Sequence, residues 1–492
     1  MKVPSDVMEE LERTEAAEER ATRYQWNDNG TGRALLDYFG RDLLAIRDAK
    51  ADDAWAFWTG EEWSLRSHNR LVAEFHRAVA QPLERVAAAQ ENDALAKWAL
   101  SCGNYGKATA GIRSAHATAQ TTEYEQAISL DEFDRAPELL GVANGILDLR
   151  GEKPELIPRS RDLLVTKSTP CAFDPEATHP ALDSYLDAFL PEPDLREFVQ
   201  RLLGYAALRD GNPERLMAWF KGGTSTGKSA IVDWVHHTLG GHYSMATDPA
   251  LFREKREQGA TSELHEALDR RFLALSEFGS STTLHVSILK RLTGSDSIQA
   301  RKAHVGDPTE RIPAFTPVVS TNEIPRIDNP DEGLRRRLVV VPFLHASDPN
   351  ERDKREVLNR ETWPAVLAWL AEGYAAFKRE GLGPDTWPGA VVRETERTFG
   401  DLSPGDQFWA ECIEEVEGER VLPADMVNAF FRWQAQEDVP EEVRLTKSKF
   451  QQFVNQRKKR RPEKRWERIG PGERKAVKFH IGVRLKPEED WG

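Results

Sequence analysis

Short apolar runs alternate with longer amphipathic stretches through the middle of the chain. Residues 216–220, 271–278 and 338–343 are rich in Leu, Val, Phe, Ala or Trp, and residues 316–322 (TPVVSTN) have a Val pair followed by polar residues. Runs of this length and character are typical of strands that are buried on both faces of a parallel sheet. Because helical segments separate them, the pattern predicts a covered α/β domain over residues 206–385.

The flanking regions follow other patterns. Residues 1–125 are predicted to be mostly helical, with a hairpin at the aromatic cluster of residues 55–63, which we interpret as core and turn. Residues 126–205 begin with short apolar runs that are split by turn residues such as Asn144 and Gly145, and they end in helical spacing over 181–208. We therefore expect a strand-and-turn segment and a helix before the α/β domain.

Composition limits the class of protein. The 492 residues exceed one typical domain, and 39% hydrophobic with 30% charged residues is ordinary for a globular protein. No apolar run is long enough to cross a bilayer and the acidic start is unlike a signal peptide, so we expect a cytoplasmic protein with no membrane partner. Cys102, Cys171 and Cys412 are far apart in the sequence, which argues against a disulfide framework or a cysteine zinc site.

Charge is distributed unevenly along the chain. The net charge is -14, yet residues 444–486 hold 16 Lys and Arg against 3 Asp and Glu. Residues 392–492 combine helices with a terminal apolar alternation, which together favour a winged-helix DNA-binding domain. A solvated charged surface carries equal weight as an alternative. The candidate DNA contacts in this region are Lys447, Lys449, Arg457, Lys458 and Lys459.

The strongest motif follows the first apolar run. Its eight residues fit G-x-x-x-x-G-K-[ST] between a predicted strand and a predicted helix that Gly240 and Gly241 end. In such a loop the glycines let backbone N–H groups converge on phosphates, the lysine meets the β- and γ-phosphates and the last hydroxyl binds Mg²⁺. The sequence thus predicts an ATP and Mg²⁺ site made of Gly222, Gly223, Thr224, Ser225, Thr226, Gly227, Lys228 and Ser229.

Two polar residues that end later apolar runs are candidates for catalysis. Glu277 follows the second run and would hold Mg²⁺ and polarise the attacking water, although a solvated strand end is the plainer interpretation. Asn322 ends the third run and would orient that water if its strand lies between the other two. Its plainer interpretation is a turn residue before Pro325.

Three arginines precede the fourth apolar run. An arginine that reaches across a subunit boundary stabilises transition-state charge in other P-loop enzymes. Arg336 and Arg337 are the candidates for this role, and a solvated basic turn remains the alternative for at least one residue of the triplet that Arg335 begins.

In this order the motifs resemble the superfamily 3 helicases, which have a P-loop AAA+ core. They are most similar to the phage and plasmid primase-helicase family, which includes the poxvirus primase-helicase. The matching segments are the P-loop, the strand that ends at Glu277, residues 290–296 (KRLTGSD), residues 320–325 (STNEIP), the pair Arg336 and Arg337, and residues 140–149 (LGVANGILDL).

The resemblance implies partners and further contacts. Members of the family form rings, generally hexamers, that translocate on single-stranded or forked DNA with a hairpin in the central channel. Here the hairpin falls on residues 298–306, so Arg301, Lys302 and His304 are candidate DNA contacts, together with Lys290 in the preceding motif.

The sequence departs from the family pattern in two places. Ser276 stands where many relatives have a second acidic residue, so Glu277 has to serve both metal and water. Residues 1–125 lack the acidic motif and the cysteines of a primase domain, so no primase active site is expected and a separate primase becomes a possible partner.

Three functions fit these observations. The leading hypothesis is an ATP-dependent replicative helicase of a phage, plasmid or satellite element. The second is a P-loop motor that acts on another substrate, and the third is an initiator or interference factor that uses nucleotide only to assemble on DNA. Lys228, Glu277, Asn322 and the arginines together favour hydrolysis.

Overall fold

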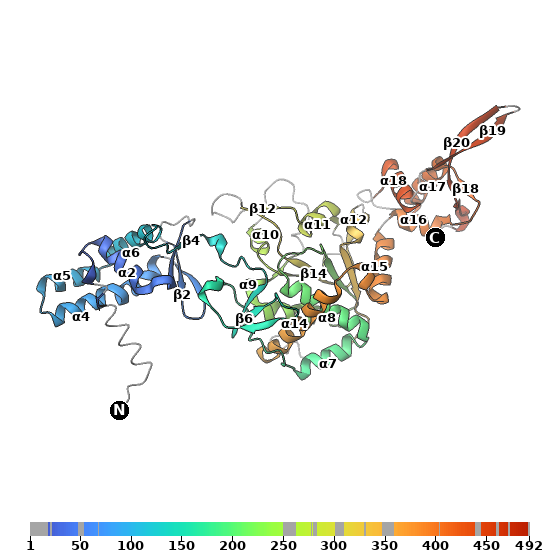
Figure 1. Cartoon of the computed structure of the whole chain (residues 1–492). Coiled ribbons are helices and arrows are strands. Elements are labelled where there is room, and N and C mark those ends of the chain that lie inside the picture. The colour runs from blue at the N-terminus through green and yellow to red at the C-terminus, as the bar shows by residue number, and fades with distance from the viewer. Residues whose placement is uncertain are drawn as a thin grey trace. The chain divides into compact units, whose positions relative to one another are not determined.

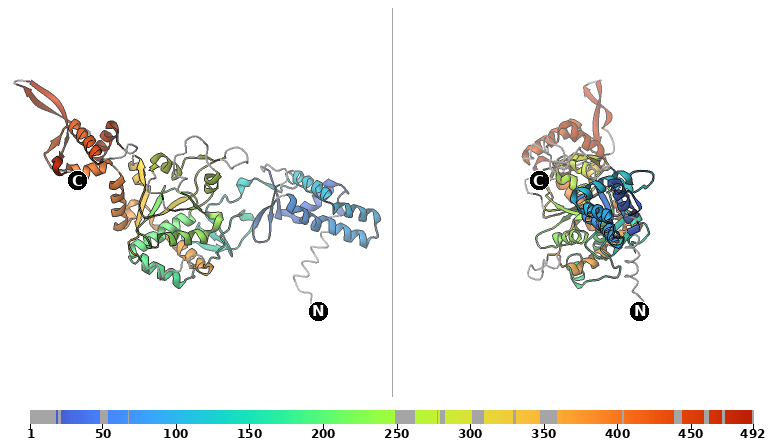
Figure 2. Two further views of the ribbon diagram at one scale, coloured as in Figure 1. Left: turned by 180° about the vertical axis from the view of Figure 1, so that it is seen from behind. Right: turned by 90° about the vertical axis from the view of Figure 1, so that its left-hand side faces the viewer.

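The computed structural model of the chain forms two compact units. The first contains Met1–Asp148 and Glu155–Ser168, and the second contains Leu149–Pro154 and Thr169–Gly492. Figure 1 labels their elements, and Figure 2 gives two further views. The residues that the structure describes are 18–19, 22–47, 54–66, 68–248, 262–276, 278, 283–300, 309–328, 331–346, 359–402, 404–437, 444–458, 462–470 and 473–490.

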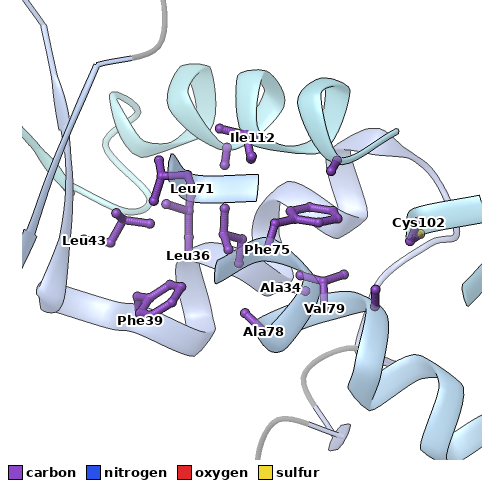
Figure 3. Packing of buried hydrophobic residues seen from close by; sticks show 14 of the residues in the cluster. Ala34, Leu36, Phe39, Leu43, Leu71, Phe75, Ala78, Val79, Cys102 and Ile112 are labelled. Atoms are coloured by element: carbon purple, nitrogen blue, oxygen red, sulfur yellow. The ribbon is translucent and has the colours of Figure 1, made fainter. Parts of the chain in front are cut away.

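Helices supply most of the core of the first unit. Helix α6 packs along α2, and Gly32 lets them approach, because a Cβ there would lie 2.7 Å from the backbone nitrogen of Ala115. Leu36, Phe75 and Ile112 are fully buried between these helices and their neighbours (Figure 3). The helices are α2 (Asp28–Phe39), α3 (His68–Phe75), α4 (Gln81–Ala89), α5 (Asp93–Cys102) and α6 (Tyr105–Ala119).

A four-stranded sheet completes this core. Its order is β3-β2-β1-β4, and β2 and β3 form the aromatic hairpin that the sequence predicted. Strand β4 pairs in parallel with β1, so the predicted boundary between residues 125 and 126 falls inside the unit. The strands are β1 (Leu43–Ile46), β2 (Trp55–Trp58), β3 (Trp63–Arg66) and β4 (Ala127–Ile128).

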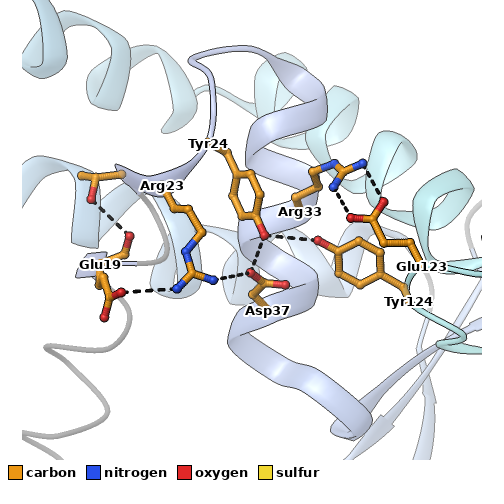
Figure 4. A network of polar contacts seen from close by, with 8 residues as sticks. Glu19, Arg23, Tyr24, Arg33, Asp37, Glu123 and Tyr124 are labelled. Atoms are coloured by element: carbon orange, nitrogen blue, oxygen red, sulfur yellow. Dashed lines mark hydrogen bonds and ion pairs between the residues drawn. The ribbon is translucent and has the colours of Figure 1, made fainter.

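Polar contacts fix the outer side of α2. Its Asp37 accepts a hydrogen bond from the Tyr24 hydroxyl at 2.6 Å, and that hydroxyl lies 3.3 Å from the Tyr124 hydroxyl (Figure 4). Arg33, also on α2, donates two hydrogen bonds to Glu123, at 2.6 and 2.9 Å. This Arg33 contact lowers the pKa of Glu123. The network therefore ties α2 to the chain that precedes it and to the loop after α6.

A second, antiparallel sheet follows in the first unit. Strand β5 (Leu139–Val142) pairs with β6 (Gly145–Asp148), which pairs with β7 (Glu155–Ile157). Val142 lies opposite Gly145, so only two residues form the turn between β5 and β6. The turn predicted at Asn144 and Gly145 is confirmed.

A five-stranded parallel sheet forms the centre of the second unit. Its order is β16-β8-β14-β10-β9, and every neighbouring pair is parallel. The four apolar runs of the sequence supply β8, β10, β14 and β16, which confirms the predicted α/β class. The strands are β8 (Met217–Lys221), β9 (Ser244–Thr247), β10 (Phe272–Leu275), β14 (Thr316–Thr321) and β16 (Leu338–Pro342).

Helices cover both faces of this sheet (Figure 1). On one face α14 packs along α8 at a close crossing, where a Cβ on Gly204 would lie 2.4 Å from the nitrogen of Tyr374. The helical stretch predicted over 181–208 is two helices, because prolines at 191 and 193 interrupt it. The helices are α7 (Pro180–Phe189), α8 (Pro193–Leu208), α9 (Lys228–Tyr243), α10 (Ser262–Ala267), α11 (Val286–Leu292), α12 (Glu332–Arg335) and α14 (Trp363–Glu380).

Helix α15 (Gly389–Leu402) packs on the edge strand β16 of the same sheet. The backbone nitrogen of Val340 donates to the Thr395 hydroxyl at 3.1 Å. Nζ of Lys221 forms an ion pair with Oε1 of Glu394 at 2.8 Å. Most of α15 lies in the range that the sequence assigned to the last module. The domain that contains the five-stranded sheet therefore includes this helix.

Three helices and a long hairpin form the end of the chain. The rings of Phe430 and Phe450 stack at 3.9 Å, with Phe408 edge-on to both, so one aromatic core holds the helices together. This order agrees with the predicted helices followed by a hairpin. The elements are α16 (Pro404–Cys412), β17 (Ile413–Glu414), β18 (Arg420–Val421), α17 (Pro423–Gln436), α18 (Lys447–Arg457), β19 (Glu463–Gly470), β20 (Glu473–Ile481) and β21 (Arg484–Leu485).

Two short strand pairs are formed by segments that lie, in the sequence, between strands of the five-stranded sheet. Strand β11 (Thr283–His285) is parallel to β15 (Arg326–Asp328), and β12 (Ile298–Ala300) is antiparallel to β13 (Thr309–Arg311). The β12 and β13 pair confirms strands at the base of the predicted hairpin, whose residues 301–308 lie outside the described part. Among the described helices, none is both long and apolar enough to cross a membrane.

Candidate nucleotide site

Three strands of the five-stranded sheet end side by side at one edge. Thr321 at the end of β14 pairs with Lys221 at the end of β8, and Val319 pairs with Leu275 at the end of β10. Strand β14 therefore lies between the strand that precedes the P-loop and the strand that precedes Glu277. This is the arrangement on which the interpretation of Asn322 depended.

Glycines shape the loop between β8 and α9. Gly227 has φ +85° directly before the helix, and a Cβ there would lie 2.8 Å from the ring of Phe189. A Cβ on Gly222 would lie 2.1 Å from the carbonyl oxygen of Phe343. Both positions thus exclude a larger residue, and the chain turns tightly into α9, where the backbone nitrogens of Ala230 and Ile231 donate to the carbonyl oxygen of Gly227.

The Lys228 ammonium group lies inside the loop. The residue is 6% exposed and donates to the carbonyl oxygens of Gly222 at 2.7 Å and Gly223 at 2.5 Å. It also lies 3.1 Å from Oδ1 of Asn322, a residue 94 positions away in the sequence. The fold therefore brings together the two polar groups that the sequence assigned to the γ-phosphate.

Two hydroxyl groups that the sequence analysis did not single out also lie here. The Ser229 hydroxyl, the candidate Mg²⁺ ligand, lies 2.9 Å from the hydroxyl of Ser320. The Tyr185 hydroxyl donates to the carbonyl oxygen of Gly227 at 3.1 Å and braces the loop. Ser320 belongs to the motif at residues 320–325 and could have been found there, whereas nothing in the local sequence marks Tyr185.

The described residues fit a nucleotide phosphate and its metal in chemical terms. The loop offers the N-terminal end of a 16-residue helix, a fixed ammonium group and a hydroxyl group, which are the groups that bind phosphate and Mg²⁺. Glu277, the predicted carboxylate of this site, lies outside the described residues, while Ser276 directly follows β10. Nowhere in the described chain do three or more His, Cys, Asp or Glu residues gather as a separate metal cluster.

The three arginines before β16 have different surroundings. Arg337 donates to the carbonyl oxygen of Lys290 at 2.7 Å, and burial lowers its pKa. Arg335 donates to Glu396 at 2.9 Å and lies over the ring of Phe399. By contrast, the Arg336 side chain is 74% exposed, and its Nε lies 3.5 Å from Oε1 of Glu332, one turn earlier in the chain. Of the two predicted candidates, only Arg336 presents its guanidinium group to solvent.

The predicted DNA contacts also differ. Lys290 forms an ion pair with Asp331, whose other oxygen accepts a hydrogen bond from the first turn of α12. Lys447 and Lys449 are exposed on α18, and Lys458 is partly exposed just after it. Arg457 pairs with Asp406. Four further predicted contacts, Arg301, Lys302, His304 and Lys459, lie outside the described residues.

Part of the chain matches a known family model, and longer stretches are similar to viral proteins. Residues 32–191 match the family model described as D5 N terminal like. A protein of Acanthamoeba polyphaga mimivirus named "Putative helicase" is 30% identical over 237 residues, which are 46% of this chain and 24% of that protein. A protein of African swine fever virus named "Putative primase" is 28% identical over 333 residues, which are 63% of this chain and 34% of that protein.

The curated relatives are much longer than the matched region, since the chain spans about a quarter to a third of their length. Among solved structures, the apo C-terminal region of NrS-1 aligns over 70% of this chain and 95% of its own, with a TM-score of 0.34 and 12% identity. The family model and the viral relatives together support a relation to phage and viral primase-helicases.

Proposed function

We propose that this chain is the ATP-driven motor of a DNA helicase that acts in the replication of a phage, plasmid or satellite element. The observation that carries the proposal is the contact of Lys228 with Asn322 at the end of adjacent parallel strands. A P-loop alone supports nucleotide binding, whereas a neutral amide beside its lysine supports a site that distinguishes ATP from its product. The strand order and the helices on both faces support a P-loop AAA+ core of the superfamily 3 type.

Each group of the loop has a role in hydrolysis. The N–H groups at the start of α9 and the Lys228 ammonium group bind the β- and γ-phosphates. Ser229 and Glu277 hold Mg²⁺, which neutralises phosphate charge when it is bound. Glu277 also takes up the proton of the attacking water, and the Asn322 side chain, which lies beside Lys228, orients that water.

Arg336 completes the site of a neighbouring subunit. Its exposed guanidinium group can reach another chain, whereas Arg335 and Arg337 contact groups of their own chain. A guanidinium group on the transferred phosphoryl group stabilises the negative charge of the transition state. This role requires subunits arranged in a ring, for which we propose a hexamer.

The last module binds DNA. Three helices followed by a hairpin support a winged helix, and Lys447, Lys449 and Lys458 lie on or beside its third helix. Their charge attracts DNA phosphates even though the chain as a whole is acidic, because screening limits the attraction to about 10 Å. A separate primase is a possible partner at the replication fork.

ATP hydrolysis by the full chain and by Lys228→Ala, with and without single-stranded DNA, tests the proposal. We expect DNA to raise a rate that Lys228→Ala abolishes, and the wild type to separate a forked duplex. Hydrolysis that ignores DNA, with the fork left closed, would favour a motor on another substrate. Retention of DNA binding and assembly in an inactive Glu277→Gln variant that still supports replication would favour an initiator or interference factor.

A further inference from the structure

A buried hydroxyl group on β14, the central strand of the five-stranded sheet, faces the first turn of α9. Ser320 is 8% exposed, and its Oγ lies 2.9 Å from Oγ of Ser229, a residue 91 positions earlier in the chain. Among the described residues, neither hydroxyl group has another hydrogen-bond partner. The two hydroxyl groups thus form a pair, and one of them is the candidate Mg²⁺ ligand.

The other two hydroxyl residues of β14 have different surroundings. Thr316 lies at the opposite end of the strand, beside Phe272 of β10. Thr321 is the last residue of the strand, and its hydroxyl group donates to the carbonyl oxygen of Glu323. Contact with the P-loop helix is therefore particular to Ser320 and is not a general property of this strand.

The register of the sheet places Ser320 level with Ser276. Val319 pairs with Leu275, the last residue of β10, so the next residues along these two parallel strands share a row. Neighbouring strands lie about 4.8 Å apart. Ser276 is exposed and makes no hydrogen bond to Ser229 in the described part of the chain. The polar group that meets Ser229 in this row thus comes from β14 and not from β10.

A hydroxyl group that binds a cation has to donate its hydrogen to another acceptor. A serine hydroxyl has one hydrogen and two lone pairs, and a metal ion takes up a lone pair. In the free chain either hydroxyl group of the pair can be the donor. When the Ser229 oxygen binds Mg²⁺, Ser229 donates and Ser320 accepts. Ser320 then fixes the direction of the Ser229 O–H bond and leaves the lone pairs of that oxygen for the cation.

The fold holds this acceptor in place. Strand β14 pairs with β8 at Ser320 and with β10 at the preceding residue, and Ser229 lies in the first turn of a 16-residue helix. Both partners therefore belong to regular elements. Groups that hydrogen-bond to a metal ligand orient it, and their removal typically costs about 10- to 100-fold in metal affinity.

We propose that Ser320 is a positioning residue for the Mg²⁺ ligand Ser229: its oxygen accepts the hydroxyl hydrogen of Ser229 when that hydroxyl group binds the cation. The proposal rests on the proposed function, since it deepens the nucleotide site of the motor. It gives the end of β14 a second task beside that of Asn322, which lies two residues further along the chain. In this role Ser320 acts on the metal through Ser229.

Binding of a fluorescent ATP analogue to the full chain, in EDTA and over a range of free Mg²⁺ concentrations, tests the proposal. Ser320→Ala should bind the analogue in EDTA within about 2-fold of the wild type, but it should need about 10-fold more Mg²⁺ for half of the Mg²⁺-dependent gain in affinity. Ser320→Thr keeps the hydroxyl group and should stay within about 3-fold. Equal losses in EDTA and in Mg²⁺, or wild-type Mg²⁺ dependence in Ser320→Ala, would overturn the proposal.

A double replacement tests whether Ser320 acts through Ser229. In Ser229→Ala the hydroxyl ligand is gone, so adding Ser320→Ala should change the Mg²⁺ dependence less than about 2-fold. A further loss of about 10-fold would contradict the positioning role. Thr316→Val removes a hydroxyl group from the other end of β14 and is the matched control, with unchanged Mg²⁺ dependence expected. If Ser320→Ala proves unstable, Ser320→Cys should show the same shift, because sulfur is a weak acceptor.

Failure of this proposal can be told apart from failure of the proposed function. If DNA stimulates Lys228-dependent hydrolysis and the fork opens, while Ser320→Ala needs no more Mg²⁺ than the wild type, only the role of Ser320 falls. If the variants bind the analogue as expected but hydrolysis ignores DNA, Ser320 keeps its role and the motor acts on another substrate. Equal binding of the analogue by the wild type in EDTA and in Mg²⁺ would overturn both the role of Ser320 and the Mg²⁺ site.

Discussion

Replacing Asn322 tests whether its amide group takes part in ATP hydrolysis. The Lys228 ammonium group lies 3.1 Å from Oδ1 of Asn322, and a hydrogen bond to a charged group contributes about 1.5 to 3 kcal/mol. Asn322 is exposed in the single chain, so the lower part of this range applies. We therefore expect Asn322→Ala to lower kcat for ATP hydrolysis about 10- to 50-fold, with KM changed less than about 3-fold.

Asn322→Asp keeps the size of the side chain but adds a negative charge beside Lys228. At an effective dielectric constant of about 20, two like unit charges 4 Å apart repel by about 4 kcal/mol, so the triphosphate should be repelled. We expect KM for ATP to rise at least about 10-fold, in addition to the loss in kcat. Asn322→Asp thus changes both KM and kcat, whereas Asn322→Ala changes mainly kcat.

Steady-state hydrolysis at saturating single-stranded DNA, with ATP varied, measures both constants. Glu323→Ala is the matched control, because this exposed neighbour contributes its backbone carbonyl to a hydrogen bond from Thr321. If Asn322→Ala hydrolyses ATP at the same rate as Glu323→Ala, Asn322 has no part in the reaction. If Asn322→Asp binds ATP as well as the wild type, the triphosphate does not lie beside this side chain.

Four further replacements test the loop, two of the arginines and a half-buried histidine. Gly227→Ala forces a Cβ into a positive-φ position 2.8 Å from Phe189, so calorimetry should show a loss of about 2 to 4 kcal/mol in stability. Arg336→Ala should lower the hydrolysis rate at least about 1,000-fold with an unchanged Tm, whereas Arg335→Ala should lower the Tm because it loses contacts within its chain. Burial lowers the pKa of His236, and the nearby His237 lowers it further. The unfolded chain therefore binds a proton at this residue more readily than the folded chain does. Urea unfolding should therefore show stability falling as the pH drops below about 6.5, less steeply in His236→Asn.

Each of these expectations has a result that would contradict it. An unchanged melting temperature in Gly227→Ala would mean that the loop adopts another path. Normal hydrolysis by Arg336→Ala would remove this residue from the active site. For His236, the same pH dependence in wild type and His236→Asn would mean that other groups cause it, with His242→Asn as the control for loss of a histidine on the same helix.

The strands of the five-stranded sheet were predictable because their local pattern is strong. The four apolar runs can bury the side chains on both of their faces only in a sheet that helices cover, and the P-loop marks the end of the first strand. The order of the strands was not predictable in the same way. That β14 lies between β8 and β10 depends on pairing between segments about 45 and 100 residues apart, which no local pattern records.

Short elements and packing partners escaped the sequence for related reasons. Strand β4 has two residues, too few to show alternation, and only its pairing with β1 makes it a strand. The three arginines look alike in the sequence, and they differ only because α15 packs beside Arg335 and α11 beside Arg337. Tyr185 reaches the P-loop from α7, a helix whose pattern shows only a buried face. The exposure of each arginine and the contact of Tyr185 with the P-loop follow from tertiary packing, which the local sequence does not record.

The position of α15 has a mechanical consequence. This helix is bonded to β16 through Thr395 and to the end of β8 through Glu394, and α16 of the last module begins two residues after it ends. A tension applied to the last module therefore reaches the five-stranded sheet through α15 rather than through a flexible linker. It is received by the strand that precedes the P-loop and by its edge neighbour. Under the proposed function, load on the DNA and occupancy of the nucleotide site act on the same two strands.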